Sequence, residues 1–281
     1  MEESKASHTA LGVAIRRASH QLYDSPPLVL DDPIAVPILG ERYRPLLEEA
    51  AASIHDKYSL SMRAWLVARS RHAEEKLEQA VIRGARQYVL LGAGLDTFAH
   101  RNPHHGVRVF EVDHPATQQW KRELLAASGL PEPVNLRYVP VDFERQSLRR
   151  QLETGGLDFG SPAVFAWLGV VLYLTHPTFR ATVDMIAAFP PGSALVFDYA
   201  LPRHVLPREE HAARDALSAR VESIGEPFKL FFTPQEIAGE LKAFSVLEDR
   251  DAKQLNALYF SNRADKLSLA GRSANIMSAW R

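Results

Sequence analysis

The pattern of hydrophobic and polar positions along the chain changes at about residue 84. Before this point, apolar residues recur at the spacing of amphipathic helices, and prolines interrupt the pattern between the first two segments. We therefore expect three helices, with Gly84 ending the third. They cover residues 6–23, 32–49 and 59–83.

After Gly84, short uninterrupted apolar runs alternate with amphipathic stretches. Such runs are typical of buried strands, and the stretches between them are typical of helices that cover a parallel sheet. Five strands are expected over residues 87–92, 106–113, 134–142, 161–170 and 192–200. Three helices are expected over residues 114–129, 143–156 and 175–189.

The C-terminal part of the chain is expected to complete this sheet. Residues 233–244 begin with a capping-box pattern and predict a helix. Residues 244–251 and 257–263 are predicted to be two terminal strands, and residues 273–281 one last short helix. The whole pattern predicts an α/β fold with a doubly wound, mostly parallel seven-stranded sheet.

The same pattern suggests four parts along the chain. Residues 1–84 would form an N-terminal helical cap and residues 85–201 the cofactor-binding core. Residues 202–232, polar and helical in pattern, would form a second cap, and residues 233–281 would complete the core.

Composition excludes several classes of protein. A net charge of −1 over 281 residues, with no basic stripe, argues against a nucleic-acid partner. No apolar run reaches the roughly 18 residues of a membrane span, and the first residues lack the apolar core of a signal peptide. The absence of cysteine fits a cytoplasmic protein, and no metal site is expected.

The stretch LLGAGLDTFAHR gives the first indication of chemistry. Gly92 and Gly94 follow the first strand, where glycine permits positive φ and a close approach of the backbone to a ligand. Asp113 ends the second strand, where a carboxylate suits a ribose diol. Thr97 stands where a dinucleotide-binding turn needs its third glycine, and Asp96 would repel a pyrophosphate. The turn therefore favours S-adenosyl-L-methionine over NAD.

The third strand ends in PVDF. Asp142 there is placed to accept a hydrogen bond from an adenine amino group, and Phe143 offers an apolar face or a backbone N–H to the ring. An alternative reading is that Asp142 caps the helix that follows, and both roles are compatible.

Together, LLGAGLDTFAHR, FEVDHP, PVDF and WLGVVLYLT resemble the leucine carboxyl methyltransferase family, in particular its bacterial branch of S-adenosyl-L-methionine-dependent O-methyltransferases. The resemblance runs from about Ala10 to Leu201. It implies the Rossmann-like sheet of class I methyltransferases and S-adenosyl-L-methionine as cofactor. The implied cofactor-binding positions are Arg69, Gly92, Gly94, Asp96, Asp113, His114, Asp142, Phe143 and Leu168.

Within this set, the resemblance assigns Gly92 and Gly94 to the methionine part of the cofactor and Asp113 to the ribose. It assigns Arg69 to the cofactor carboxylate, and Arg17 matches a basic position of the N-terminal helix more loosely. Carboxyl methyltransferases of the family have a glutamate at the position of Leu168. The missing acid argues against protein carboxyl methylation more than against the cofactor.

The most favoured function is O-methylation of a small molecule, a phenol or a carboxylate, with polyketide-like compounds among the candidate acceptors. Tyr173, Tyr199 and His204 follow or end the fourth and fifth strands and are the candidates for contact with the acceptor. A phenol would benefit from a general base, whereas a carboxylate would not. Two alternatives stay open: a protein C-terminal carboxyl methyltransferase, and a non-catalytic nucleotide-binding protein of the same fold.

Overall fold

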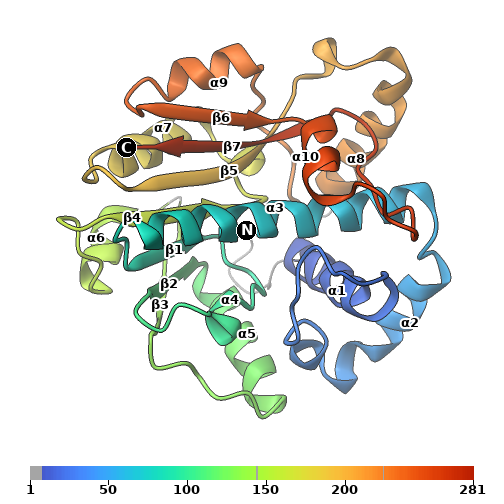
Figure 1. The fold of residues 1–281 in the computed structure, drawn as a ribbon, viewed down its shortest axis with the longest axis horizontal. Coiled ribbons are helices and arrows are strands. Elements are labelled where there is room, and N and C mark those ends of the chain that lie inside the picture. The colour runs from blue at the N-terminus through green and yellow to red at the C-terminus, as the bar shows by residue number, and fades with distance from the viewer. Residues whose placement is uncertain (1–7, 144, 224) are drawn as a thin grey trace.

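The computed structural model describes residues 8–143, 145–223 and 225–281. Its centre is a seven-stranded sheet in the order β3-β2-β1-β4-β5-β7-β6 (Figure 1). The five strands β1 to β5 are parallel, and β7 runs antiparallel between β5 and β6. The expected mostly parallel α/β sheet is confirmed. The strands are β1 (Gln87–Leu91), β2 (Arg108–Asp113), β3 (Leu136–Pro140), β4 (Ala163–Trp167), β5 (Ala194–Ala200), β6 (Val246–Arg250) and β7 (Ala274–Trp280).

Helices cover both faces of the sheet because its central strands are apolar on both sides. One face packs on α3 (Lys57–Ile82), α4 (Phe98–Arg101) and α10 (Ala252–Tyr259), which share a core with β1 and β4. The other face packs on α6 (Leu148–Thr154), α7 (His176–Ala187) and α9 (Pro234–Glu240). The remaining core helix, α5 (Pro115–Ala127), contacts β3.

The N-terminal segment lies beside α5 and forms a smaller core of its own (Figure 1). The expected first helix is α1 (His8–Tyr23). The single helix predicted over residues 32–49 is wrong: this segment holds two 3-10 turns, Pro37–Leu39 and Glu41–Tyr43, before α2 (Arg44–Ala52). Gly40, with φ +57°, separates the two turns and breaks any continuous helix.

Two of the C-terminal predictions are wrong: a predicted strand is part of a helix, and a predicted helix is a strand. Residues 257–263, predicted to be a strand, contribute the end of α10, which starts at a capping box formed by Asp251 and Gln254. The last residues, predicted to be a helix, form β7, which is buried between two strands. Pairing with β5 over seven positions therefore overrides the local pattern of β7.

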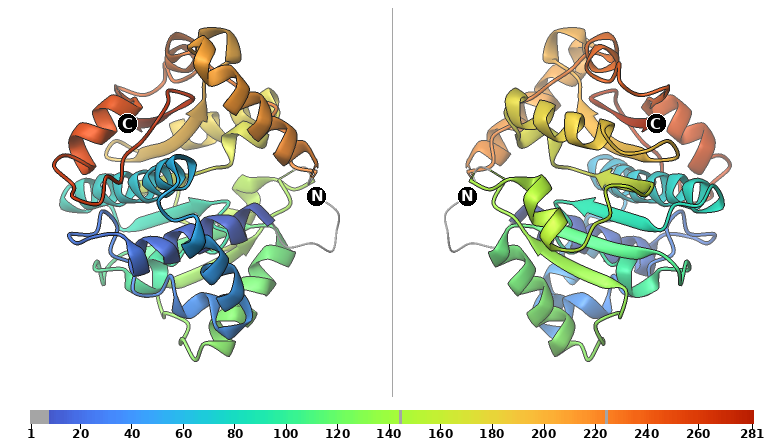
Figure 2. Two further views of the ribbon diagram at one scale, coloured as in Figure 1. Left: turned by 90° about the vertical axis from the view of Figure 1, so that its right-hand side faces the viewer. Right: turned by 90° about the vertical axis from the view of Figure 1, so that its left-hand side faces the viewer.

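Residues 203–223 form two 3-10 turns, Arg203–Val205 and Arg208–Glu210, followed by α8 (His211–Ser223). Figure 2 shows α8 descending toward the start of α1. Across the described ranges, 8–143, 145–223 and 225–281, no helix has the length and apolar character to cross a membrane. The division into four parts stays a prediction.

Candidate active site

The carboxyl ends of β1 to β5 lie on one edge of the sheet because these strands are parallel. Ligands of open α/β sheets bind at this edge, near the point where the strand order reverses. Here the order reverses between β1 and β4, so the loops after these two strands frame the candidate site.

The turn after β1 is built from glycines for steric reasons. Gly92 and Gly94 have φ values of +70° and +53°, as expected from the sequence. A Cβ atom on Gly92 would come within 2.4 Å of the Val170 side chain, and one on Gly94 within 3.2 Å of Ala10. The loop after β4 and helix α1 therefore both press against this turn.

Asp113, at the end of β2, is tied to the same turn. Its carboxylate accepts hydrogen bonds from the backbone N–H of Gly94 at 2.6 Å and of His114 at 2.7 Å. Burial raises the pKa of Asp113, and the two N–H groups oppose this rise. Each carboxylate oxygen can accept a further hydrogen bond, so the group can still bind a hydroxyl.

Asp96 follows the glycine turn and is held by groups of the chain. Its carboxylate accepts hydrogen bonds from Arg17 at 2.8 Å and from the backbone of Phe98 at 2.7 Å. Although burial opposes ionisation, Arg17 and Arg101 hold the pKa of Asp96 at about 2. The charge of Asp96 is thus compensated within the chain, and its role in cofactor binding stays a prediction.

We call Arg17, Asp32, Asp96 and Thr97 the Arg17 clamp. Arg17 also donates to Asp32 at 2.7 Å and to Thr97 at 3.1 Å, and Thr97 donates to Asp32 at 2.6 Å. Arg17 was only a loose candidate from the sequence. The clamp joins α1 to the loop after β1, and so holds the N-terminal segment over the strand ends.

At the end of β3, Asp142 is half-buried and its backbone N–H donates to Gln146. The alternative reading of Asp142 as the cap of the next helix is wrong, since Ser147 caps α6. Phe143 packs against the core beneath α6 and α7. His114 caps α5, where its ring nitrogen accepts from Ala116 at 3.3 Å.

Arg69, from the middle of α3, reaches the strand ends from the face opposite α7. It donates to Asp198 of β5 at 3.2 Å, and Asp198 also accepts from the backbone N–H of Gly169 at 2.5 Å. Gly169, with φ +71°, leaves room for the guanidinium: a Cβ there would lie 2.7 Å from Arg69. Leu168 packs into the core beside α3.

Asp198 ends the fifth predicted strand at the same edge, but the sequence alone assigns it no role in the site. The signal that could have found it is a carboxylate within an otherwise apolar strand, because a buried charge needs a partner. Its partner Arg69 is 129 residues away in the sequence, so no local pattern links the two.

Of the three candidates for acceptor contact, only Tyr173 joins this group. Its ring lies 5.6 Å from that of Phe228, in the segment after α8. Burial raises the pKa of Tyr173, and a hydrogen bond with Thr9 of α1 opposes the rise. Tyr173 therefore lies where α1 and the segment after α8 meet the strand ends.

The structure does not bring Tyr199 and His204 into this group. Tyr199 alternates with Asp198 along β5 and so points to the opposite face, where its hydroxyl donates to Asp249 at 2.7 Å. His204 is exposed and lies within electrostatic range of Glu236 at the start of α9. Their contact with an acceptor stays a prediction that these positions do not support.

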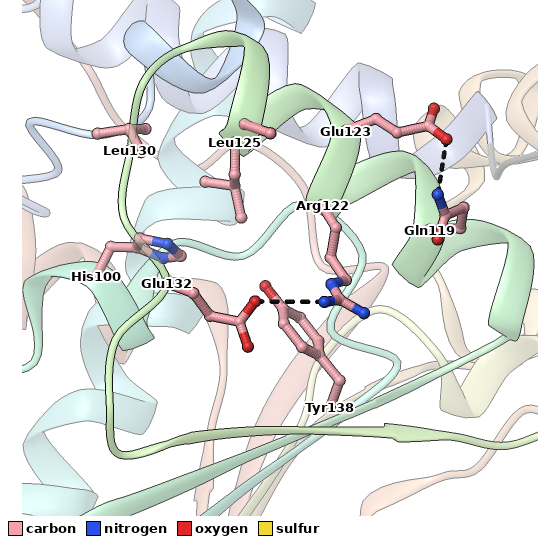
Figure 3. Close-up of a pocket in the computed structure, with 9 residues that line it drawn as sticks. His100, Gln119, Arg122, Glu123, Leu125, Leu130, Glu132 and Tyr138 are labelled. Atoms are coloured by element: carbon pink, nitrogen blue, oxygen red, sulfur yellow. Dashed lines mark hydrogen bonds and ion pairs between the residues drawn. The ribbon is translucent and has the colours of Figure 1, made fainter.

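A hollow of about 450 Å³ lies elsewhere, between α4, α5 and β3. Figure 3 shows Arg122 between Glu132, at 3.6 Å, and the ring of Tyr138. None of the residues that line this hollow is among the strand-end residues described above. It is therefore separate from the candidate active site.

Comparisons with known proteins agree with this fold. The leucine carboxyl methyltransferase family matches residues 10–187, more than half of the chain. YktD of Bacillus subtilis (strain 168), named as a candidate S-adenosyl-L-methionine-dependent methyltransferase, is 34% identical over 298 aligned positions, 95% of this chain and 96% of that protein. A protein of Mycolicibacterium paratuberculosis with the same kind of name is 34% identical over 203 positions, 68% of this chain and 64% of its own.

Solved structures support the fold. A DUF574 family protein from Streptomyces avermitilis superposes with a TM-score of 0.56 at 18% identity, covering 99% of both chains. A candidate methyltransferase from Thermobifida fusca gives a TM-score of 0.55 at 21% identity, covering 87% of this chain and 92% of its own. The chain belongs to the leucine carboxyl methyltransferase family and is a methyltransferase that uses S-adenosyl-L-methionine.

Proposed function

We propose that this methyltransferase transfers the methyl group to an oxygen of a small molecule, a phenol or a carboxylate. The observation that carries the proposal is the meeting of the two caps above the strand ends. Thr9 of α1 donates a hydrogen bond to Glu226, which follows α8, and Tyr173 lies beside this contact. A covered edge suits a small acceptor better than the extended terminus of a protein.

The strand-end residues fit S-adenosyl-L-methionine by their chemistry. A carboxylate with spare acceptor capacity, Asp113, suits the ribose hydroxyls. Among the described residues, Asp198 takes only one of the five N–H donors of Arg69, so the guanidinium can also hold the methionine carboxylate. Asp142 and Phe143 are assigned to the adenine.

The remaining positions act through the scaffold in this proposal. Gly92 and Gly94 keep the turn free of side chains beneath the methionine part. Asp96 fixes the turn through Arg17, and His114 starts α5 beside the adenosine. Leu168 packs the loop that carries Gly169 against α3.

The bound cofactor supplies a methyl group on a sulfonium, which is displaced by in-line attack. The chain then has to align the acceptor oxygen with the methyl carbon and exclude water. Tyr173 is placed to orient the acceptor from the cap side. A carboxylate acceptor needs no general base because it is already ionised at neutral pH.

The test has two stages. In thermal unfolding, S-adenosyl-L-methionine and its demethylated product should stabilise the protein by about 2.7 kcal/mol at a hundredfold excess over the dissociation constant, and NAD should not. A labelled-methyl assay should then compare phenols, small carboxylic acids and peptides ending in leucine. Label on the peptides alone would replace this proposal by protein carboxyl methylation, and cofactor binding without any transfer would favour a non-catalytic protein.

A further inference from the structure

The cap above the strand ends contains a buried cation without an anionic partner. Arg214 of α8 is 8% exposed. The three other buried arginines of the described residues, Arg17, Arg63 and Arg69, all pair with aspartates. Arg214 has no such pair, and its Nη2 atom is buried without a hydrogen-bond partner among the described residues. The adjacent Asp215 pairs with Arg203 on the surface instead.

Two aromatic rings hold the Arg214 guanidinium in place. Its central carbon lies 5.2 Å from the ring centre of Phe228 and 4.7 Å from that of Phe231. Such contacts stabilise and orient the cation, but they do not supply hydrogen-bond acceptors for its N–H groups. An arginine held in this way retains unused N–H donors, and the chemical group that best matches two of them is a carboxylate.

Backbone contacts place the segment that holds the two phenylalanines at the carboxyl ends of β4 and β5, beside Tyr173. Lys229 donates its N–H to Leu172 at 2.7 Å, and Phe232 donates to Ala200 at the end of β5 at 3.0 Å. The segment between Phe228 and Phe232 therefore follows the carboxyl ends of β4 and β5. Phe228 also contacts Tyr173, and α8 descends on the side where α1 begins (Figure 2). We call Tyr173, Arg214, Phe228 and Phe231 the Arg214 cluster.

We propose that the Arg214 cluster is a binding site for the carboxylate of the methyl acceptor, so that the acceptor is a small organic acid. The inference rests on the proposed small-molecule function and narrows the acceptor from a phenol or a carboxylate to a compound that carries a carboxylate. A buried guanidinium discriminates strongly between a carboxylate and a neutral isostere, because only the charged group replaces the hydration that the guanidinium has lost.

The experiment measures binding separately from catalysis. With the cofactor site saturated by S-adenosyl-L-homocysteine, calorimetry should compare aromatic and aliphatic hydroxy acids with their matched amides. The wild-type protein should bind at least one acid about tenfold or more tightly than its amide. Arg214→Gln should remove this preference, and Arg214→Lys should retain part of it. Both variants should bind S-adenosyl-L-homocysteine with unchanged affinity. The matched control is Arg220→Gln, an exposed arginine on the same helix, which should behave as wild type.

Each result decides the inference. Equal binding of acid and amide by the wild-type protein, binding of no acid, or a preference that survives in Arg214→Gln overturns it. If Arg214→Gln does not fold, the wild-type comparison and Arg214→Lys still decide. Preference for peptides with a free C-terminus over small acids would assign the carboxylate to a peptide and also overturn it. Acid binding that depends on Arg214 without methyl transfer supports the carboxylate site and refutes the proposed function. Methyl transfer to neutral phenols at a rate that Arg214→Gln does not change supports the proposed function and refutes the carboxylate site.

Discussion

Two buried polar clusters lie on opposite sides of the strand ends, and they differ in how their charges are balanced. In the Arg17 clamp, the cation has two carboxylate partners, and Thr97 bridges to one of them. In the Arg214 cluster, the cation has aromatic neighbours but no carboxylate within the described residues. Burying a charge costs free energy of solvation in both clusters. Among the described residues, only the clamp supplies opposite charges that offset this cost.

This difference assigns a structural role to the Arg17 clamp and, in our proposal, a ligand-binding role to the Arg214 cluster. The clamp pairs its cation with carboxylates of the chain and so fixes two segments to each other, leaving no unpaired charge for a ligand. The unpaired guanidinium of Arg214 leaves its charge and its N–H donors for a ligand that arrives from solution. The position of each cluster agrees with this distinction, because the clamp joins α1 to the glycine turn, whereas the Arg214 cluster lies over the ends of β4 and β5.

The largest effect is expected from breaking the clamp. Arg17→Met removes the cation that hydrogen-bonds both Asp32 and Asp96 and leaves these buried carboxylates only more distant cations such as Arg101. Loss of one member of a buried ion pair costs about 3–5 kcal/mol, so the free energy of unfolding should fall by that amount. Urea denaturation at neutral pH measures it.

The matched control is Arg44→Met, which removes an arginine of an exposed ion pair with Glu41 in the same N-terminal segment. Its unfolding curve should coincide with that of the wild-type protein. If Arg17→Met were no more destabilising than Arg44→Met, the clamp would not fix α1, and the contrast with the Arg214 cluster would lose its basis.

A smaller effect is expected at Asp113, on cofactor affinity. Asp113→Asn keeps the shape of the side chain and removes the charge that would accept the ribose hydroxyls. Affinity for S-adenosyl-L-methionine should fall by about 1.5–3 kcal/mol, or roughly 10- to 150-fold, as measured by calorimetry. Glu123→Gln, on the exposed side of α5, is the control and should bind normally. An affinity within twofold of wild type would remove Asp113 from the cofactor site.

The glycine turn, Asp113 and the first five strands could be predicted because their signals are local. Each strand is a short apolar run, and the turn requires positive φ at two positions close in sequence. The strand β7 could not be predicted in the same way. Its identity depends on pairing with β5 and β6, and small residues such as Ser278 and Ala279 carry little strand preference.

The side chains that complete the site are also hard to predict from the sequence, because their contacts join segments that are far apart along the chain. Asp198 belongs to the site because it pairs with Arg69. Arg214 does so because two phenylalanines of an irregular segment after α8 pack against it. None of these contacts has a fixed spacing along the chain. Tyr199 was chosen because it ends a strand, but alternation along β5 places its side chain on the other face.

The last prediction is a pH dependence and concerns a third buried polar group, His72, which carries no charge at neutral pH. His72 of α3 contacts Tyr259 at 2.9 Å and Ser278 at 3.0 Å, and joins α3 to α10 and β7. Burial, together with the nearby Lys76, lowers the pKa of His72 to about 4. The unfolded chain therefore binds a proton at His72 near pH 6.5, whereas the folded protein does not until about pH 4. The stability contributed by the neutral ring is complete above pH 6.5 and is lost as the pH falls toward 4, with a limiting slope of about 1.4 kcal/mol per pH unit.

Urea denaturation between pH 7 and pH 4.5 measures this slope. His72→Gln retains hydrogen bonding to its neighbours but cannot titrate, so its stability should fall less steeply with decreasing pH than that of the wild-type protein. His204→Gln, at an exposed site, should keep the wild-type slope. Identical slopes in the wild-type protein and in His72→Gln would mean that His72 is protonated equally in the folded and unfolded states. Folding would then not depress the pKa of His72, and its contact between α3 and β7 would not require a neutral ring.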